Sequence, residues 1–142
     1  MSESFQVTFD AANPQRLGEF WAAVLGYVMQ PPPEGFDSWD AFLDSVSWPA
    51  DQRDAMYAIV DPEGTKPRLL FQKVPEGKTA KNRVHLDVNV GAGLPHDERK
   101  SAVRTRADEI VALGATELRT AEENGEYWIV MQDIDGNEFC VQ

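Results

Sequence analysis

Apolar and polar residues alternate over residues 5–11 and 83–90, and this period of two predicts two half-buried strands. One side of each stretch is apolar and is expected to face a hydrophobic core. That side carries Phe5, Val7 and Phe9 in the first stretch, and Val84, Leu86, Val88 and Val90 in the second. The other side is polar and carries Gln6, Thr8 and Asp10 in the first stretch, and His85, Asp87 and Asn89 in the second.

Two further stretches, about 14–25 and 98–113, have apolar residues at helical spacing, and both end in Leu-Gly. Asn13 suits the N-cap of the first helix, and Pro14 suits its first helical position. Gly26 and Gly114 are suited to end the helices. The residues expected to point inward are Leu17, Phe20, Trp21, Val24 and Leu25 in the first helix, and Val103, Ala107, Ile110 and Val111 in the second.

The two halves of the chain repeat one plan. Each helix is followed by three segments typical of strands: 27–30, 54–61 and 67–74 in the first half, and 115–120, 127–133 and 138–142 in the second. An Asp-x-acid-Gly phrase occurs at 61–64 and again at 133–136, an offset of 133 − 61 = 72 residues. The pattern therefore predicts an α+β fold of two β-α-β-β-β modules within one domain, 1–142. Module one spans about 1–75 and module two about 82–142.

Residues 32–55 have no counterpart in the second half. Phe36, Trp39, Leu43 and Val46 fall at helical spacing, which predicts a short amphipathic helix ending near Trp48. This insertion is interpreted as a lid over a ligand site. The alternative is that its helix packs on the outside of the sheet.

Composition narrows the classes of partner. The chain has 142 residues, of which 42% are apolar, and a formal net charge of −11. Such an acidic chain is not expected to bind nucleic acid or an anionic membrane, because both require a basic surface. The N-terminal residues are not typical of a signal peptide, and no stretch is apolar enough for a membrane span. The single cysteine, Cys140, suits the reducing cytoplasm.

Three motifs together resemble the vicinal oxygen chelate superfamily, and most closely its glyoxalase-like domain subgroup. They are "NPQRLGEFWAAVLGY" in the first helix, "NRVHLDV" in the second polar-faced strand, and "DIDGNEFCVQ" at the end of the chain. The resemblance implies that the two modules form a curved eight-stranded sheet around a cup-shaped cavity. It also implies a small organic ligand and a homodimer.

Members of this superfamily that use metal place ligands on four strands facing the cup. The resemblance places these positions at Gln6 or Thr8, at Gln72 or Leu70, at His85, and at Cys140, with Glu138 at the same strand parity as Cys140. Gln, His and Cys do not supply the carboxylates that magnesium, manganese or iron sites require. We therefore expect no metal cofactor. If a metal binds, its ligands are expected to be Gln6, His85, and Glu138 or Cys140.

His85 is the candidate catalytic residue, because histidine has an ordinary pKa near neutrality and can act as a general acid or base. The alternative is a neutral histidine that bonds to Asp87 or to another residue of the cup and has no chemical role. Cys140 is more typical of an inert core thiol than of a nucleophile. The residues expected to contact a ligand are Gln6, Thr8, Trp39, Trp48, Tyr57, Gln72, His85, Trp128 and Cys140.

The sequence favours a glyoxalase-like protein that binds a small organic molecule without a catalytic metal. Such a protein either sequesters its ligand or catalyses a metal-free isomerase or lyase reaction through His85. One alternative is a metal-dependent lyase or dioxygenase of the same superfamily. Another is a non-catalytic interaction module whose cup is filled by its own side chains. The residues do not identify the substrate.

Overall fold

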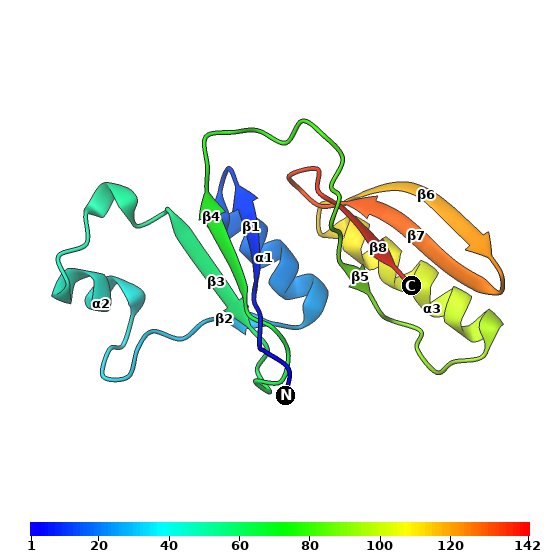
Figure 1. Cartoon of the computed structure of the whole chain (residues 1–142), viewed down its shortest axis with the longest axis horizontal. Helices are drawn as coiled ribbons and strands as arrows, with labels where there is room; N and C mark the ends of the chain where they lie inside the picture. Colours follow the sequence, from blue (N-terminus) through cyan, green and yellow to red (C-terminus); the bar gives the residue numbers. More distant parts are fainter. The chain divides into compact units, whose positions relative to one another are not determined.

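The computed structural model describes residues 1–142, which divide into two compact units, Met1–Glu76 and Gly77–Gln142. Figure 1 shows the helices and strands of both units. The first unit contains β1 (Val7–Ala11), α1 (Pro14–Leu25), β2 (Val28–Met29), α2 (Trp39–Ser45), the 3-10 helix η1 (Ala50–Gln52), β3 (Met56–Val60) and β4 (Leu69–Lys73). The second unit contains β5 (Asp87–Val88), α3 (His96–Ala112), β6 (Thr116–Glu123), β7 (Glu126–Gln132) and β8 (Glu138–Val141).

Both units have the same sheet topology. Sheet A has the strand order β1-β4-β3-β2, and sheet B has the order β5-β8-β7-β6. The first strand of each unit pairs in parallel with the last, and the other neighbours are antiparallel. The predicted α+β fold of two tandem β-α-β-β-β modules is confirmed, as two four-stranded sheets. The cup-shaped cavity stays a prediction.

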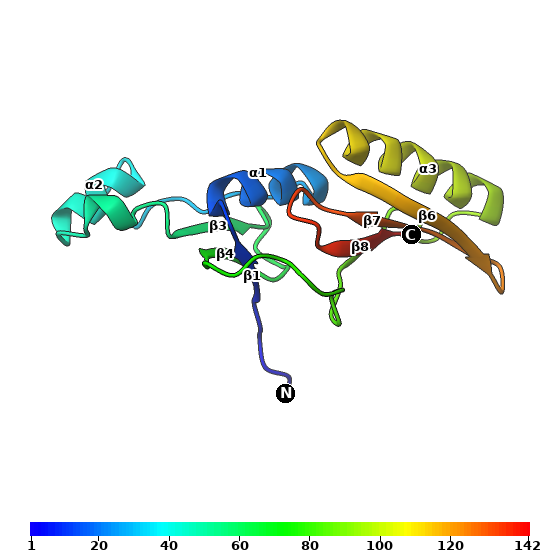
Figure 2. The same ribbon diagram turned by 90° about the horizontal axis from the view of Figure 1, so that it is seen from above.

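In the first unit, α1 covers one face of sheet A (Figure 2). Asn13 caps this helix by accepting from the Arg16 N–H, and Gly26 ends it with a positive φ of 72°, both as predicted. Gly18 is required by a close approach, because a Cβ atom there would lie 2.3 Å from the ring of Tyr57. The buried side chains of this core are Leu17, Phe20, Trp21, Val24, Ile59, Leu69 and Phe71.

In the second unit, α3 packs on sheet B through Val103, Ala107 and Ile110, as predicted. Val111 was expected to point inward, and this expectation is wrong, since the residue is 41% exposed. Val103, Ala107 and Ile110 form a stripe at spacings of four and three, whereas Val111 lies about 100° around the helix from Ile110. The strand residues buried beneath α3 are Tyr127, Ile129, Met131, Phe139 and Val141.

The two polar-faced strands are shorter than predicted. Residues 83–90 contain only the strand Asp87–Val88, with backbone hydrogen bonds to β8 reaching from Leu86 to Val90. Val84 lies outside this ladder and is 84% exposed, so its expected core position is wrong. Phe5 likewise precedes the first hydrogen bond of β1, from the Val7 N–H, and is 70% exposed. Apolar alternation thus continues past the point where the partner strand ends.

The repeated Asp-x-acid-Gly phrase forms the same turn in both units. The buried carboxylate of Asp61 accepts from the backbone N–H groups of Glu63, Thr65 and Lys66. Asp133 does the same for Asp135 and Asn137. Each turn glycine has a positive φ, 71° at Gly64 and 86° at Gly136. These turns join β3 to β4 and β7 to β8, so the repeated phrase in the sequence corresponds to a repeated turn in the structure.

The insertion 32–55 forms α2 and η1, which extend to the side of β3 (Figures 1 and 2). The helix is shorter than the predicted stripe, because Phe36 and Val46 fall outside Trp39–Ser45. None of the residues 32–55 is buried. Arg53 ties the insertion together through ion pairs with Asp40 and Asp44. A lid function for this segment stays a prediction. No helix in the structure is both long and apolar enough to span a membrane.

Candidate functional site

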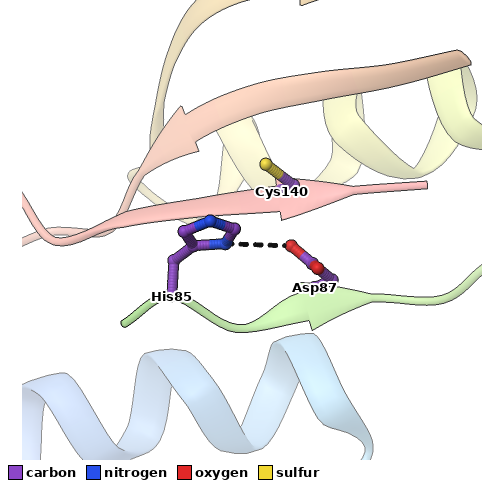
Figure 3. Close-up of side chains that lie close together, drawn as sticks. All are labelled: His85, Asp87 and Cys140. Carbon is purple, nitrogen blue, oxygen red and sulfur yellow. Dashed lines mark hydrogen bonds and ion pairs between the residues drawn. The ribbon is translucent and has the colours of Figure 1, made fainter. Parts of the chain in front are cut away.

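The face of sheet B opposite α3 brings three chemically active side chains together (Figure 3). Asp87 of β5 pairs with Cys140 of β8, and partners in register point to the same face. His85 lies two residues before Asp87 and therefore shares its side. A ring nitrogen of His85, a carboxylate oxygen of Asp87 and the Sγ atom of Cys140 all lie within 4.8 Å of one another.

His85 and Asp87 form a direct contact in which Nδ1 lies 3.0 Å from Oδ1. An ionised carboxylate only accepts hydrogen bonds, so Nδ1 carries the proton in this contact. The neutral ring then presents Nε2 as its acceptor nitrogen. Both side chains are 41% exposed, which leaves them accessible to a ligand.

Cys140 is half-buried beside this pair. Burial raises the pKa of the Cys140 thiol, and the charge of Asp87 and a hydrogen bond to its carboxylate raise it further. Arg119 and Lys81 oppose this shift. The group is therefore a protonated thiol at neutral pH rather than a reactive thiolate, in agreement with the expected inert cysteine.

Glu138 has a different role from Cys140, although the two share a strand side. The backbone N–H of Asn82 donates to its Oε2 at 2.9 Å, and Nζ of Lys78 lies 3.2 Å from the same atom. These contacts, the Asn82 hydrogen bond first, lower the pKa of Glu138 to about 2. The carboxylate holds the segment before β5 against β8.

Three predicted site residues, Gln6, Thr8 and Gln72, lie together on the face of sheet A opposite α1. The Oε1 atom of Gln6 accepts from Nη1 of Arg68 at 3.0 Å, and its Nε2 lies 3.4 Å from Oγ1 of Thr8. Gln72 donates from Nε2 to Asp10 at 2.9 Å. Leu70, the alternative to Gln72, shares this face, because β4 alternates between buried Leu69 and Phe71 and the residues between them.

The four aromatic candidates lie in different surroundings. The ring of Tyr57 packs at Gly18 on the helix-covered face of sheet A, so it does not join Gln6 and Thr8. Trp39 donates from Nε1 to the carbonyl of Gln30 at 2.7 Å and is half-buried. Trp48 is exposed and donates to the carbonyl of Gln52 within the insertion. Trp128 is half-buried on the α3-free face of sheet B, opposite Ala121.

Residues 6–142 match the family described as "Glyoxalase-like domain". The chain belongs to this family. The expected relationship to the vicinal oxygen chelate superfamily is confirmed. A search of curated proteins finds no match to this glyoxalase-like chain.

Solved structures share the fold at low sequence identity. A glyoxalase/bleomycin resistance protein/dioxygenase family enzyme from Burkholderia phytofirmans is 16% identical, with a TM-score of 0.63 over 96% of this chain and 94% of its own. The fosfomycin resistance protein FosX from Mesorhizobium loti is 10% identical, with a TM-score of 0.62 over 100% and 91%. A FosX variant from Listeria monocytogenes, solved with Mn(II) and 1S,2S-dihydroxypropylphosphonic acid, is 10% identical, with a TM-score of 0.63 over 100% and 90%.

Sequence reasoning about this glyoxalase-like chain missed two arginines beside the candidate residues. Arg68 contacts Gln6 on sheet A, and Arg119 lies in register with Val130, the neighbour of Cys140, on sheet B. Arg68 stands two positions before Leu70, so strand alternation alone places it on the polar side. Arg119 follows a register irregularity in β6, so counting alternate residues along the strand does not show which face its side chain is on.

Proposed function

We propose that the chain binds a small organic molecule and acts without a divalent metal, with His85 as its acid–base residue. The arrangement of His85, Asp87 and Cys140 on the open face of sheet B carries this proposal. The protein then either sequesters the molecule or catalyses an isomerase or lyase reaction on it. Both outcomes begin with the same binding step, so one set of experiments tests them together.

The His85–Asp87 contact supports proton transfer at Nε2. Asp87 fixes the ring orientation through Nδ1 and stabilises the imidazolium that forms when Nε2 accepts a proton. This is the division of labour expected of a general base whose second nitrogen is held by a carboxylate. The protonated Cys140 thiol stands beside the pair as a weak donor rather than as a nucleophile.

The partners of the remaining candidate ligands argue against a magnesium or manganese centre. Gln6 Oε1 is bound by the guanidinium of Arg68, whose charge repels a divalent cation. The Glu138 carboxylate is bound by Asn82 and Lys78. Such metals require several free oxygen ligands, and neither Gln6 nor Glu138 offers an unengaged oxygen donor. The resemblance to a FosX protein solved with Mn(II) therefore does not extend to this donor set.

A zinc-type site is the second candidate. His85, Asp87 and Cys140 offer nitrogen, oxygen and sulfur donors within 4.8 Å of one another, and zinc accepts all three. Binding would release the thiol proton of Cys140. Zinc titration of the full chain separates the candidates, since a stoichiometric complex with proton release favours the metal site.

A thermal-shift screen of aromatic and polyketide-like compounds, run in excess EDTA, tests the leading proposal. We expect at least one compound to stabilise the full chain, and His85→Ala to weaken that effect. His96→Ala is the matched control, because His96 is equally exposed but bonds to Gly125 and Glu122 away from Asp87. Stabilisation by no compound would contradict the proposal and favour an interaction module.

We also propose that the chain forms a homodimer and is located in the cytoplasm. The single free cysteine supports a reducing location, because it leaves no intramolecular disulfide to form. Light scattering of the purified chain tests the dimer, and a monomeric mass at micromolar concentration would contradict it.

A further inference from the structure

Arg68 is held in an unusual way on the open face of sheet A. Its Nε donates to Oε1 of Gln30 at 2.8 Å, and its Nη1 donates to Oε1 of Gln6 at 3.0 Å. Both partners are neutral amide oxygens. Two of the five N–H donors of the guanidinium are thereby fixed, and the other three are left for another acceptor.

The guanidinium of Arg68 has no carboxylate partner, although the chain carries a net charge of −11. Arg53, Arg99, Arg104 and Arg106 all form ion pairs with Asp or Glu. Arg16, Arg83 and Arg119 also lack a carboxylate, but they are not fixed by side-chain hydrogen bonds. Arg68 alone among the arginines is both oriented and free of a countercharge, and it is half-buried.

The surroundings of Arg68 combine a polar and an apolar part. Thr8, Leu70 and Ala58 lie in register across β1, β4 and β3 on the same face. Leu70 and Ala58 are half-buried, and Thr8 is exposed. A molecule that placed an oxyanion on Arg68 would lay its carbon skeleton along this row.

We propose that Arg68 is the anion-binding residue of a ligand site on the open face of sheet A. The site takes a small organic acid that joins a carboxylate or phosphonate to a short apolar group. Gln6 and Gln30 are positioning residues that aim the guanidinium. A planar guanidinium binds such oxyanions through two parallel N–H bonds, and its prior orientation lowers the entropic cost. Every residue of this site lies in the first unit, so it does not depend on His85.

The competing explanation is that Arg68 only ties β1 to the end of β2. Under that explanation the loss of Arg68 lowers stability without affecting anion binding. Calorimetry with three probes of equal chain length separates the two explanations. Hexanoate and hexylphosphonate carry the oxyanion, and hexanol is the neutral control. We expect saturable binding of at least one anion, with the difference between them showing which oxyanion fits, and much weaker binding of hexanol.

Arg68→Met should weaken anion binding by about tenfold or more, which is the loss expected for a charge-assisted bidentate contact. Arg68→Lys should restore only part of it, because an ammonium lacks the planar fork. Arg16→Met is the matched control, since it removes the same charge from an exposed position on α1, and it should bind like the wild type. Circular dichroism checks that each variant is folded.

Gln6→Glu tests the same claim without removing Arg68. The new carboxylate would occupy the guanidinium and exclude the ligand, so anion affinity should fall while the melting temperature is kept or raised. Unchanged binding in Gln6→Glu and Arg68→Met, or equal binding of hexanol and the anions, would overturn the proposal. Neither readout involves His85. A negative result at Arg68 therefore does not contradict the proposed function at His85, and a negative result at His85 does not contradict anion binding at Arg68.

Discussion

The Nδ1 atom of His85 lies 3.0 Å from Oδ1 of Asp87, two residues along the same chain segment. This contact decides which ring nitrogen carries the proton, because a carboxylate can only accept. It therefore decides which nitrogen faces a ligand as a base. The proposed chemistry depends on this orientation.

Replacing Asp87 by asparagine should change the tautomer of His85. The neutral wild-type ring is expected to be protonated mainly at Nδ1, and Asp87→Asn should increase the population protonated at Nε2. Nitrogen-15 NMR of the imidazole measures both populations directly. The signals of His96 serve as the internal control, because its partners Gly125 and Glu122 are unchanged. The same tautomer ratio in both proteins would show that Asp87 does not orient the ring.

Cys140 should react slowly with iodoacetamide at neutral pH. Burial and the charge of Asp87 raise the pKa of its thiol, so little thiolate is present. Asp87→Asn removes the charge that contributes to this shift and should increase the rate. Asp97→Asn, in the first turn of α3, is the charge-matched control and should have little effect. A wild-type rate equal to that of a free cysteine peptide would argue against the raised pKa.

Glu138→Gln should lower the free energy of unfolding at pH 7 by about 1–2 kcal/mol, because it weakens charge-assisted hydrogen bonds with Asn82 and Lys78. The folded pKa of Glu138, about 2, lies below the ordinary glutamate value of 4.5. This contribution is therefore present above the unfolded pKa and is lost as the pH falls through the folded pKa. Urea denaturation at neutral and acidic pH should show the gap between the two proteins closing on acidification. Glu123→Gln, at an exposed site in the same unit without an ion pair, serves as the control.

Asp133→Ala should destabilise the second unit by about 2 kcal/mol, since it leaves the turn N–H groups of Asp135 and Asn137 without their acceptor. Asp133→Asn should cost less, because an amide oxygen still accepts. Urea denaturation measures both changes. Equal effects of the two substitutions would show that burial of the side chain, rather than the turn hydrogen bonds, controls stability.

Gly18→Ala should destabilise the first unit by about 1–3 kcal/mol, because the added Cβ would lie 2.3 Å from the Tyr57 ring. The double variant with Tyr57→Leu should recover part of this loss, since leucine is smaller at the contact. Thermal denaturation of the two variants gives the comparison. A double variant that recovers none of the stability lost in Gly18→Ala would mean that Tyr57 does not pack against Gly18.

The fold could be predicted because each helix carries one apolar stripe and each half repeats the same strands. The turn phrase at Asp61 and Asp133 could also be recognised, although its buried hydrogen bonds could not. Val84 was misplaced because its burial depends on where the partner strand ends, and one strand's alternation does not contain that information. Tyr57 lies two residues before buried Ile59 in β3, so strand alternation places it on the helix-covered face. The expectation that Tyr57 contacts a ligand did not take this alternation into account.

The candidate site was predictable only in part. His85 and its contact with Asp87 follow from two residues on one side of a strand. The partners of Gln6, Glu138 and Cys140 do not, because Arg68 is 62 residues from Gln6, and Asn82 is 56 residues from Glu138. Long-range partners of this kind decide whether a candidate ligand atom is free, and no local pattern in the sequence reports them.

Metal-free binding at His85 is best tested by calorimetric titration of the most stabilising compound from the screen, with and without excess EDTA. We expect the same affinity in both conditions, weaker binding to His85→Ala, and unchanged binding to His96→Ala. Binding that disappears in EDTA and returns with Mn2+ or Zn2+ would contradict this expectation.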